Sequence, residues 1–116
     1  MGTQKRNISK RIESAYPLTP MQQGILYHKM LDETSSEYTL QNVLRIKGRL
    51  DEECIRQSLG ILSARYKILR TVFPYRGLST YRQLVLRERR LEFRTLEIAG
   101  RGGVEEQLET FRRQDL

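Results

Sequence analysis

With 116 residues the chain is long enough for at most one ordinary domain, and its mean hydropathy of −0.60 leaves little apolar material for a core. The net charge of +7 favours an acidic partner such as nucleic acid, an anionic membrane or an acidic protein, with a solvated basic surface as the alternative. Cys54 is the only cysteine, which excludes a disulfide framework and fits a cytoplasmic protein, and no stretch is long and apolar enough for a membrane span or signal peptide.

Residues 1–15 are polar and basic, and we expect them to form an arm in front of the domain. Ile8 and Ile12 are four apart and indicate a short helical face. Two interpretations stay open, a solvated flexible arm and a docking segment that becomes ordered on a partner. The arm's cations, opposed by the single acid Glu13, are Lys5, Arg6, Lys10 and Arg11.

Residues 16–31 carry a strong helix start. Thr19 is placed as the N-cap, Pro20 as the first helical residue and Gln22 three residues after the cap, which together form a capping box. His28, the only histidine, lies on the helix flank without a neighbouring Ser, Cys or carboxylate. We therefore expect it to contact a neighbour rather than to belong to a catalytic set.

The stretch 50–73 organises the rest of the chain, because it reads as an amphipathic helix that leads directly into a buried strand. Asp51 is the predicted N-cap, and apolar residues recur at helical spacing up to Tyr66. Residues 69–73 then alternate as a strand that Pro74 ends. So short a joint implies a helix laid back on a sheet, which predicts an α/β or α+β fold.

Alternating side chains predict strands over 38–47, 81–88 and 91–98, and a final helix is expected from Val104 to the last residues. The expected order is α-β-α-β-β-(β)-α in an α+β sandwich. Leu116 follows no terminating signal, so we expect the domain to be incomplete within this sequence.

No catalytic constellation and no metal-ligand set are recognisable in the sequence. Arginines are frequent in residues 82–94, where a nucleic-acid-binding sheet is the functional interpretation. The stretch lacks the aromatic pair on adjacent strands that such sheets use, and arginines that protect an edge strand explain it equally well. A basic nucleic-acid-binding α/β module is therefore kept as the alternative function.

Two motifs carry a resemblance to a known family. YPLTPMQQGILYH, residues 16–28, resembles the first core motif of condensation domains of nonribosomal peptide synthetases. RYKILRTVF, residues 65–73, resembles their second core motif, RHExLRTxF, in the family's order and spacing. Tyr66 and Lys67 depart from that motif, in which His and Glu are usual, and Gly24 replaces the common Arg of the first motif.

The resemblance implies that residues 16–116 are the N-terminal portion of a condensation domain with a chloramphenicol-acetyltransferase-like fold. The parent reaction is amide formation between carrier-bound peptidyl and aminoacyl thioesters, so phosphopantetheine is expected on partner carrier proteins and no cofactor is expected on this chain. The family's catalytic motif HHxxxDG is absent from these residues, so no catalytic residue is assigned and the chain alone is predicted to be inactive. A related acyltransferase of the same fold is a third interpretation.

The resemblance also gives roles to the basic residues. Arg65 and Arg70 are expected to be structural, as guanidinium forks that tie the strand end to carboxylates near the active site. Lys5, Arg6, Lys10 and Arg11 would steer the acidic C-terminal tail of an upstream subunit onto the arm. The T-P-M-Q-x-G form of the first motif resembles the branch of the family that accepts a D-configured donor.

Overall fold

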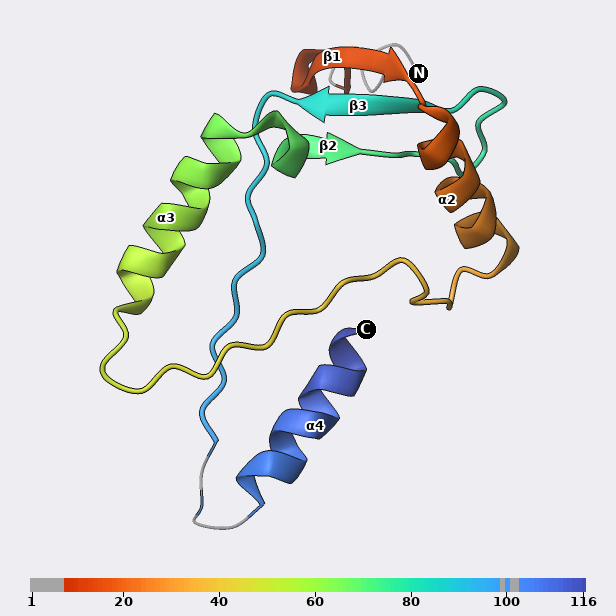
Figure 1. Ribbon diagram of the computed structural model, residues 1–116. Helices are drawn as coiled ribbons and strands as arrows, with labels where there is room; N and C mark the ends of the chain where they lie inside the picture. Colours follow the sequence, from red (N-terminus) through yellow and green to blue (C-terminus); the bar gives the residue numbers. More distant parts are fainter. Residues whose placement is uncertain (1–7, 99, 101–102) are drawn as a thin grey trace.

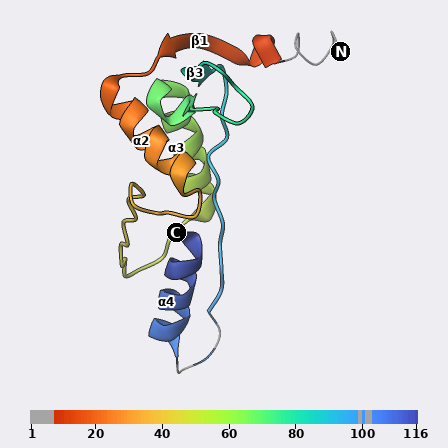
Figure 2. The ribbon, with the colours of Figure 1, turned by 90° about the vertical axis from the view of Figure 1, so that its right-hand side faces the viewer.

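The computed structural model describes residues 8–98, 100 and 103–116, so Lys5 and Arg6 of the predicted arm lie outside the described residues. A small sheet lies at one end of the molecule, two helices descend from it, and a third helix lies at the far end (Figure 1). Figure 2 shows the three helices on the same side of the sheet. The resulting shape is elongated, with extents of 54 × 33 × 29 Å.

The sheet contains β1 (Ile12–Pro17), β2 (Thr71–Val72) and β3 (Arg82–Leu86), with β3 in the centre. Both neighbours run antiparallel to it, and Leu84 is the partner of Ala15 on one side and of Val72 on the other. Residues 8–11 are helical and lead into β1, which has an irregularity in its pairing between Ile12 and Ser14.

Residues 12–15 therefore belong to the sheet, although we predicted them as the end of a solvated or docking arm. The strand was not recognisable because its more buried positions alternate with exposed ones without an apolar pattern. Ile12 and Ser14 are half-buried while Glu13 and Ala15 are exposed. A docking role for the arm stays a prediction.

Helix α2 (Pro20–Leu31) begins as predicted. The Gln22 backbone N–H donates to Thr19 Oγ1 at 3.2 Å, and the Thr19 N–H donates to Gln22 Oε1 at 2.9 Å, which confirms the capping box. The same amide contacts Gln83 of β3 at 3.1 Å, and Gln83 Nε2 also donates to the Pro17 carbonyl at 3.1 Å. The start of α2 is thus fastened to the end of the sheet.

Helix α3 (Glu52–Arg65) also begins at the predicted cap, where Asp51 accepts the Cys54 N–H at 3.1 Å. The predicted strand 69–73 is shorter than expected. A 3-10 turn, η1 (Lys67–Arg70), fills the joint, and only Thr71–Val72 pair with β3. Helix α4 (Val104–Asp115) forms where expected and begins after Gly103, which has a left-handed φ of 80°.

Two predicted strands are wrong. Residues 38–47 and 91–98 are irregular, so the observed order is β1-α2-α3-η1-β2-β3-α4 rather than α-β-α-β-β-(β)-α. Alternation supplies one apolar face, but a strand also needs a neighbour for its backbone hydrogen bonds. Within the described residues neither segment has one. The coarser prediction of an α/β or α+β fold is confirmed, because the structure combines helices with a small antiparallel sheet. The predicted laying of α3 back on the sheet is not observed in the described residues, since α3 packs mainly against η1.

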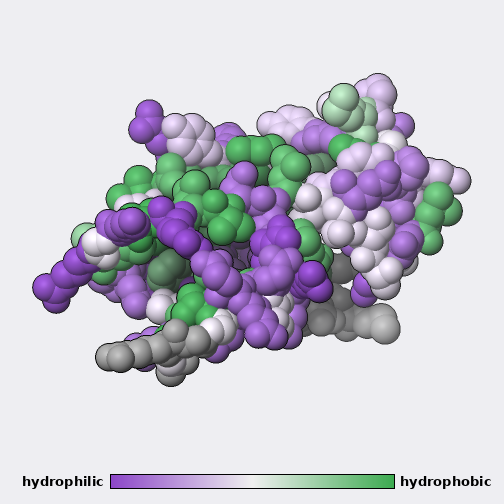
Figure 3. Space-filling model, turned by 60° about the horizontal axis from the view of Figure 1, so that its bottom comes forward, coloured by the Kyte–Doolittle hydropathy of each residue, from purple (hydrophilic) through white to green (hydrophobic). Residues whose placement is uncertain are grey.

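The apolar core is small. Among the described residues the buried apolar side chains are Leu18, Leu26 and Val85, whereas Leu40 and Leu44 are 92% and 82% exposed. Figure 3 shows apolar side chains at the surface beside strongly polar ones. Segment 38–47 is held to α4 by polar contacts: Gln41 Nε2 donates to the Arg112 carbonyl at 3.1 Å, and Arg45 pairs with Glu105.

We predict that the 116-residue chain associates with itself, because exposed apolar side chains in an unpaired, alternating segment favour intermolecular strand pairing. Sedimentation velocity over a range of concentrations measures this. The double substitution Leu40→Lys and Leu44→Lys should reduce the association, whereas Arg82→Gln should leave it unchanged. A monomeric chain with one cooperative, concentration-independent unfolding transition would contradict the prediction.

Candidate functional site

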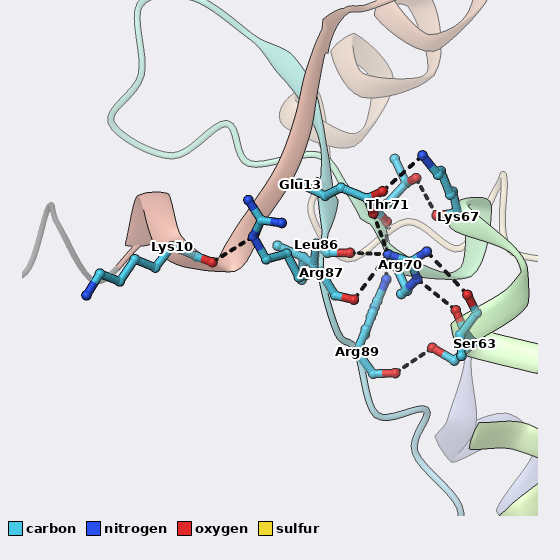
Figure 4. A network of polar contacts seen from close by, with 10 residues as sticks. Lys10, Glu13, Ser63, Lys67, Arg70, Thr71, Leu86, Arg87 and Arg89 are labelled. Atoms are coloured by element: carbon cyan, nitrogen blue, oxygen red, sulfur yellow. Dashed lines mark hydrogen bonds and ion pairs between the residues drawn. The ribbon is translucent and has the colours of Figure 1, made fainter. Parts of the chain in front are cut away.

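The guanidinium of Arg70 is the most extensively bonded side chain of the described structure and is buried, with 6% of the residue exposed. Its Nε donates to the Ser63 carbonyl at 2.8 Å, and Nη2 lies 3.4 Å from the Ala64 carbonyl. Its Nη1 donates to the Leu86 carbonyl at 2.5 Å and to a Glu13 carboxylate oxygen at 2.8 Å. Figure 4 shows these groups converging on one side chain.

This arrangement follows from the end of a helix and the end of a strand meeting at one place. The last carbonyls of a helix have no partner within the helix, and Ser63 and Ala64 supply two of them. The Leu86 carbonyl is at the end of β3. Because Arg carries five N–H donors in a planar fork, Arg70 can satisfy these carbonyls and a carboxylate together. It therefore joins β1, α3 and β3.

Glu13 is the acidic member of this cluster. Its carboxylate accepts from Arg70 at 2.8 Å and from Lys67 Nζ at 2.9 Å, and its side chain is 29% exposed. The Arg70 hydrogen bond, followed by the Lys67 hydrogen bond, holds the pKa of the Glu13 carboxyl below its usual range. The carboxylate is thus charged at neutral pH, as a buried guanidinium requires of its partner.

A second set of bonds fixes the backbone around Arg70. The buried Ser63 hydroxyl donates to the Arg89 carbonyl at 2.5 Å, and Arg89 Nη1 donates to the Thr71 carbonyl at 3.2 Å. The Thr71 hydroxyl donates back to the Lys67 carbonyl at 2.9 Å. These bonds connect the end of α3, the 3-10 turn and the segment after β3 (Figure 4).

Comparison with known proteins places this chain in a family. The sequence model of the condensation domain family matches residues 12–116. The chain belongs to the condensation domain family. The matched range includes residues 16–28, which contain the capping box of α2, and residues 65–73, which contain Arg70.

The relatives are large synthetases. The chain is 46% identical over 89 residues, 77% of its length, to a subunit of the linear gramicidin synthase of Brevibacillus parabrevis. It is 49% identical over 81 residues, 70% of its length, to surfactin synthase subunit 2 of Bacillus subtilis (strain 168), and 33% identical over 107 residues, 90% of its length, to bacitracin synthase 1 of Bacillus licheniformis. It spans about 2% of the length of each of these relatives.

The two predicted arginines of this condensation domain segment differ in surroundings. Arg70 contacts a carboxylate, as expected, whereas Arg65 is exposed and lies over the Tyr66 ring with its Cζ atom 5.5 Å from the ring centroid. Among the described residues no ion pair joins Arg65 to an acid. The structure thus brings one of the two predicted guanidinium forks to a carboxylate. Their position relative to an active site stays a prediction.

Lys10 and Arg11 of the predicted docking set are exposed and lie at the end of β3. The Lys10 carbonyl accepts from Arg87 Nε at 3.1 Å, and the Arg11 carbonyl accepts from the Arg87 backbone N–H at 2.8 Å. Their side chains are therefore presented next to those of β3. His28 contacts the rings of Tyr27 and Tyr38, with centroids 6.2 and 5.7 Å away.

Sequence reasoning did not find Glu13 and Ser63 as members of the site. Glu13 could have been noticed in the sequence, because it is the single acid among the basic residues 1–15. Ser63 had no comparable signal, since its hydroxyl bonds a backbone carbonyl 26 residues away. No cluster of His, Cys, Asp and Glu that could hold a metal ion is found in the described residues. None of their helices is long and apolar enough to cross a membrane.

We predict that Arg70→Gln destabilises the fold by about 3 kcal/mol, because it removes a buried cation and leaves carbonyls of α3 and β3 without donors. Urea unfolding of the dilute protein measures the change. The control is Arg65→Gln, which removes the same charge from an exposed position and should change stability by less than about 0.5 kcal/mol. Equal effects of the two substitutions would show that Arg70 is an ordinary surface cation.

The Glu13 cluster also predicts a pH dependence. The pKa of Glu13 is lowered from 4.5 in the folded state, so its contribution to stability is present above about pH 4.5 and is lost as the pH falls through the lower folded value. The difference in melting temperature between the native protein and Glu13→Gln should therefore shrink below about pH 4.5. Glu37→Gln, in which the replaced carboxylate makes no ion pair within the described residues, should show no such convergence. A difference that stays constant down to about pH 2 would contradict the assignment.

Proposed function

We propose that the protein carrying this chain forms an amide bond between two carrier-bound thioesters. The amine of an aminoacyl thioester attacks the carbonyl of an upstream peptidyl thioester, a C–N bond forms, the C–S bond breaks, and the upstream thiol leaves with a proton. The proposal rests on membership of the condensation domain family over residues 12–116. The observation that carries it is the second motif itself, whose Arg70 is built into a buried joint between sheet and helix.

In this reaction the chain serves as scaffold. Its single histidine, His28, packs against tyrosine rings, and the 116 residues contain no HHxxxDG motif, so they supply no general base. We assign the chain to the N-terminal lobe of a chloramphenicol-acetyltransferase-like fold in the cytoplasm, where it lines part of the substrate tunnel. The phosphopantetheine arms of partner carrier proteins deliver both thioesters into that tunnel. The T-P-M-Q-x-G sequence at residues 19–24 supports a D-configured donor residue.

The arm has a separate role in the proposal, which is docking of the acidic C-terminal tail of an upstream subunit. The exposed Lys10 and Arg11 side chains support this assignment, together with the basic composition around Lys5 and Arg6. A nucleic-acid surface is less well supported, because two of the arginines after β3 already have partners within the chain. Arg89 bonds the Thr71 carbonyl and Arg94 bonds Glu92 at 2.7 Å.

A condensation assay with two loaded carrier proteins tests the proposal. The full-length protein should form the dipeptidyl thioester on the downstream carrier protein, and the 116-residue chain should form none. Arg70→Lys in the full-length protein should lower the rate about tenfold or more, because a point charge does not reproduce a fork that holds three elements together. Arg65→Lys should have a smaller effect. Product formation by the 116-residue chain, or an inactive full-length protein with loaded carriers, would refute the proposal.

A further inference from the structure

Two hollows are both lined by Arg90, which follows the end of β3. The first has a volume of about 520 Å³ and is lined by Lys10, Arg11, Leu86, Arg87, Glu88 and Arg90. The second has a volume of about 440 Å³ and is lined by Arg56, Leu59, Gly60, Arg90, Leu91, Glu92 and Phe93. Because Arg90 lines both, the hollows are neighbours on one surface, and we call them together the Arg90 groove.

The first hollow is cationic. Four of its six lining residues are Lys or Arg, one is acidic, and all four cationic residues are exposed. Among the described residues, none of these four makes an ion pair with an acid. This contrasts with Arg70, Arg76, Arg94 and Arg112, each of which has a carboxylate partner. The cations around the first hollow are therefore available for an external anion.

Backbone and side-chain hydrogen bonds of Arg87 hold it beside Lys10 and Arg11. The Arg87 N–H bonds the Arg11 carbonyl at 2.8 Å, and its guanidinium Nε bonds the Lys10 carbonyl at 3.1 Å. Figure 4 shows the Arg87 side chain bridging to Lys10 in this way. The Arg87 guanidinium, just after β3, and the backbone of the two basic residues before β1 are thus held together. A ligand that binds such a pre-organised cluster loses less conformational entropy of the protein side chains.

The second hollow is mostly apolar. Leu59, Leu91 and Phe93 are half-buried along it. Gly60 leaves open space, because a Cβ added there would meet no atom within 4 Å. The Arg56 guanidinium lies over the Phe93 ring, 5.1 Å from its centroid, so that this face of the ring is already occupied. An aliphatic side chain therefore suits the hollow better than a stacked base.

We propose that the Arg90 groove binds an acidic peptide segment, with carboxylates against Lys10, Arg11, Arg87 and Arg90 and an adjacent aliphatic side chain beside Gly60. This inference rests on the proposed docking function and extends it. The surface that receives the acidic tail continues from the arm onto the condensation domain itself, through Arg87, Arg90 and the helix α3. Charge complementarity decides the occupant, since the cationic hollow is continued by a mostly apolar hollow with room for an aliphatic side chain.

Binding is measured by fluorescence anisotropy with the full-length protein and a fluorescein-labelled peptide in which a run of glutamates is followed by leucine. The double substitution Arg87→Gln and Arg90→Gln should weaken binding about tenfold, because two unpaired cations of the groove are lost. Arg82→Gln, which removes an exposed arginine of β3 that does not line the groove, should leave the affinity unchanged.

A second pair of variants tests the apolar hollow without changing charge. Gly60→Leu fills the open space beside α3 and should weaken binding of the leucine peptide several-fold, but not that of a peptide in which serine replaces the leucine. Gly24→Leu is the matched control, because Gly24 is also helical, also has open space at its Cβ position, and does not line the groove.

The outcomes separate this inference from the proposed function. Loss of binding in the Arg87 and Arg90 variant, together with the leucine-dependent effect of Gly60→Leu, supports the groove. If Lys5→Gln with Arg6→Gln abolishes binding while the groove variants bind normally, docking is confined to the arm and the groove is refuted. Tighter binding of a labelled oligothymidine than of the acidic peptide would also refute it. The condensation assay is unaffected by any of these results, because its two carrier proteins are supplied already loaded.

Discussion

The structure depends on the burial of one guanidinium. A charged Arg70 is stable inside the molecule only because a carboxylate and several carbonyls replace the water that it loses. Those acceptors come from β1, α3 and β3, which are far apart along the chain. With only Leu18, Leu26 and Val85 as buried apolar residues in the described structure, the polar cluster contributes much of the specificity with which strand, turn and helix are joined. Arg70 thereby performs a task that a larger apolar core performs in most domains of this size.

The parts of the fold that could be predicted from sequence are those specified by local contacts. Thr19 and Asp51 each accept a hydrogen bond from the backbone N–H three residues further on, and Gln22 bonds back to Thr19. Both helix starts can therefore be predicted from a few neighbouring residues. The joint after α3 was predicted as a direct passage into a strand. It contains a 3-10 turn, and from the end of this turn Arg70 bonds the Ser63 carbonyl, a contact that side-chain periodicity does not encode.

The parts that could not be predicted depend on partners distant in sequence. β1 forms because its backbone hydrogen-bonds to the edge of β3. Residues 38–47 are irregular because no strand within the described structure lies beside them to accept and donate backbone hydrogen bonds. The same distinction applies to the site. Arg70 was found through a motif, whereas its counter-ion Glu13 lies 57 residues away and could not be paired with it from spacing alone. A family resemblance identifies the residue, and the structure identifies the residue that neutralises it.

The pairing of β1 with β3 also has a consequence for the order of events during synthesis. Residue 12 pairs with residue 86, so the first strand emerges from the ribosome long before the strand on which it can hydrogen-bond. β2 reaches the same partner after only a short loop, so the hairpin of β2 and β3 can form first. Until β3 is complete, the backbone groups of β1 therefore have no strand partner in this sheet. Of the three strands of the sheet, β1 is made first and is the last that can be added to it.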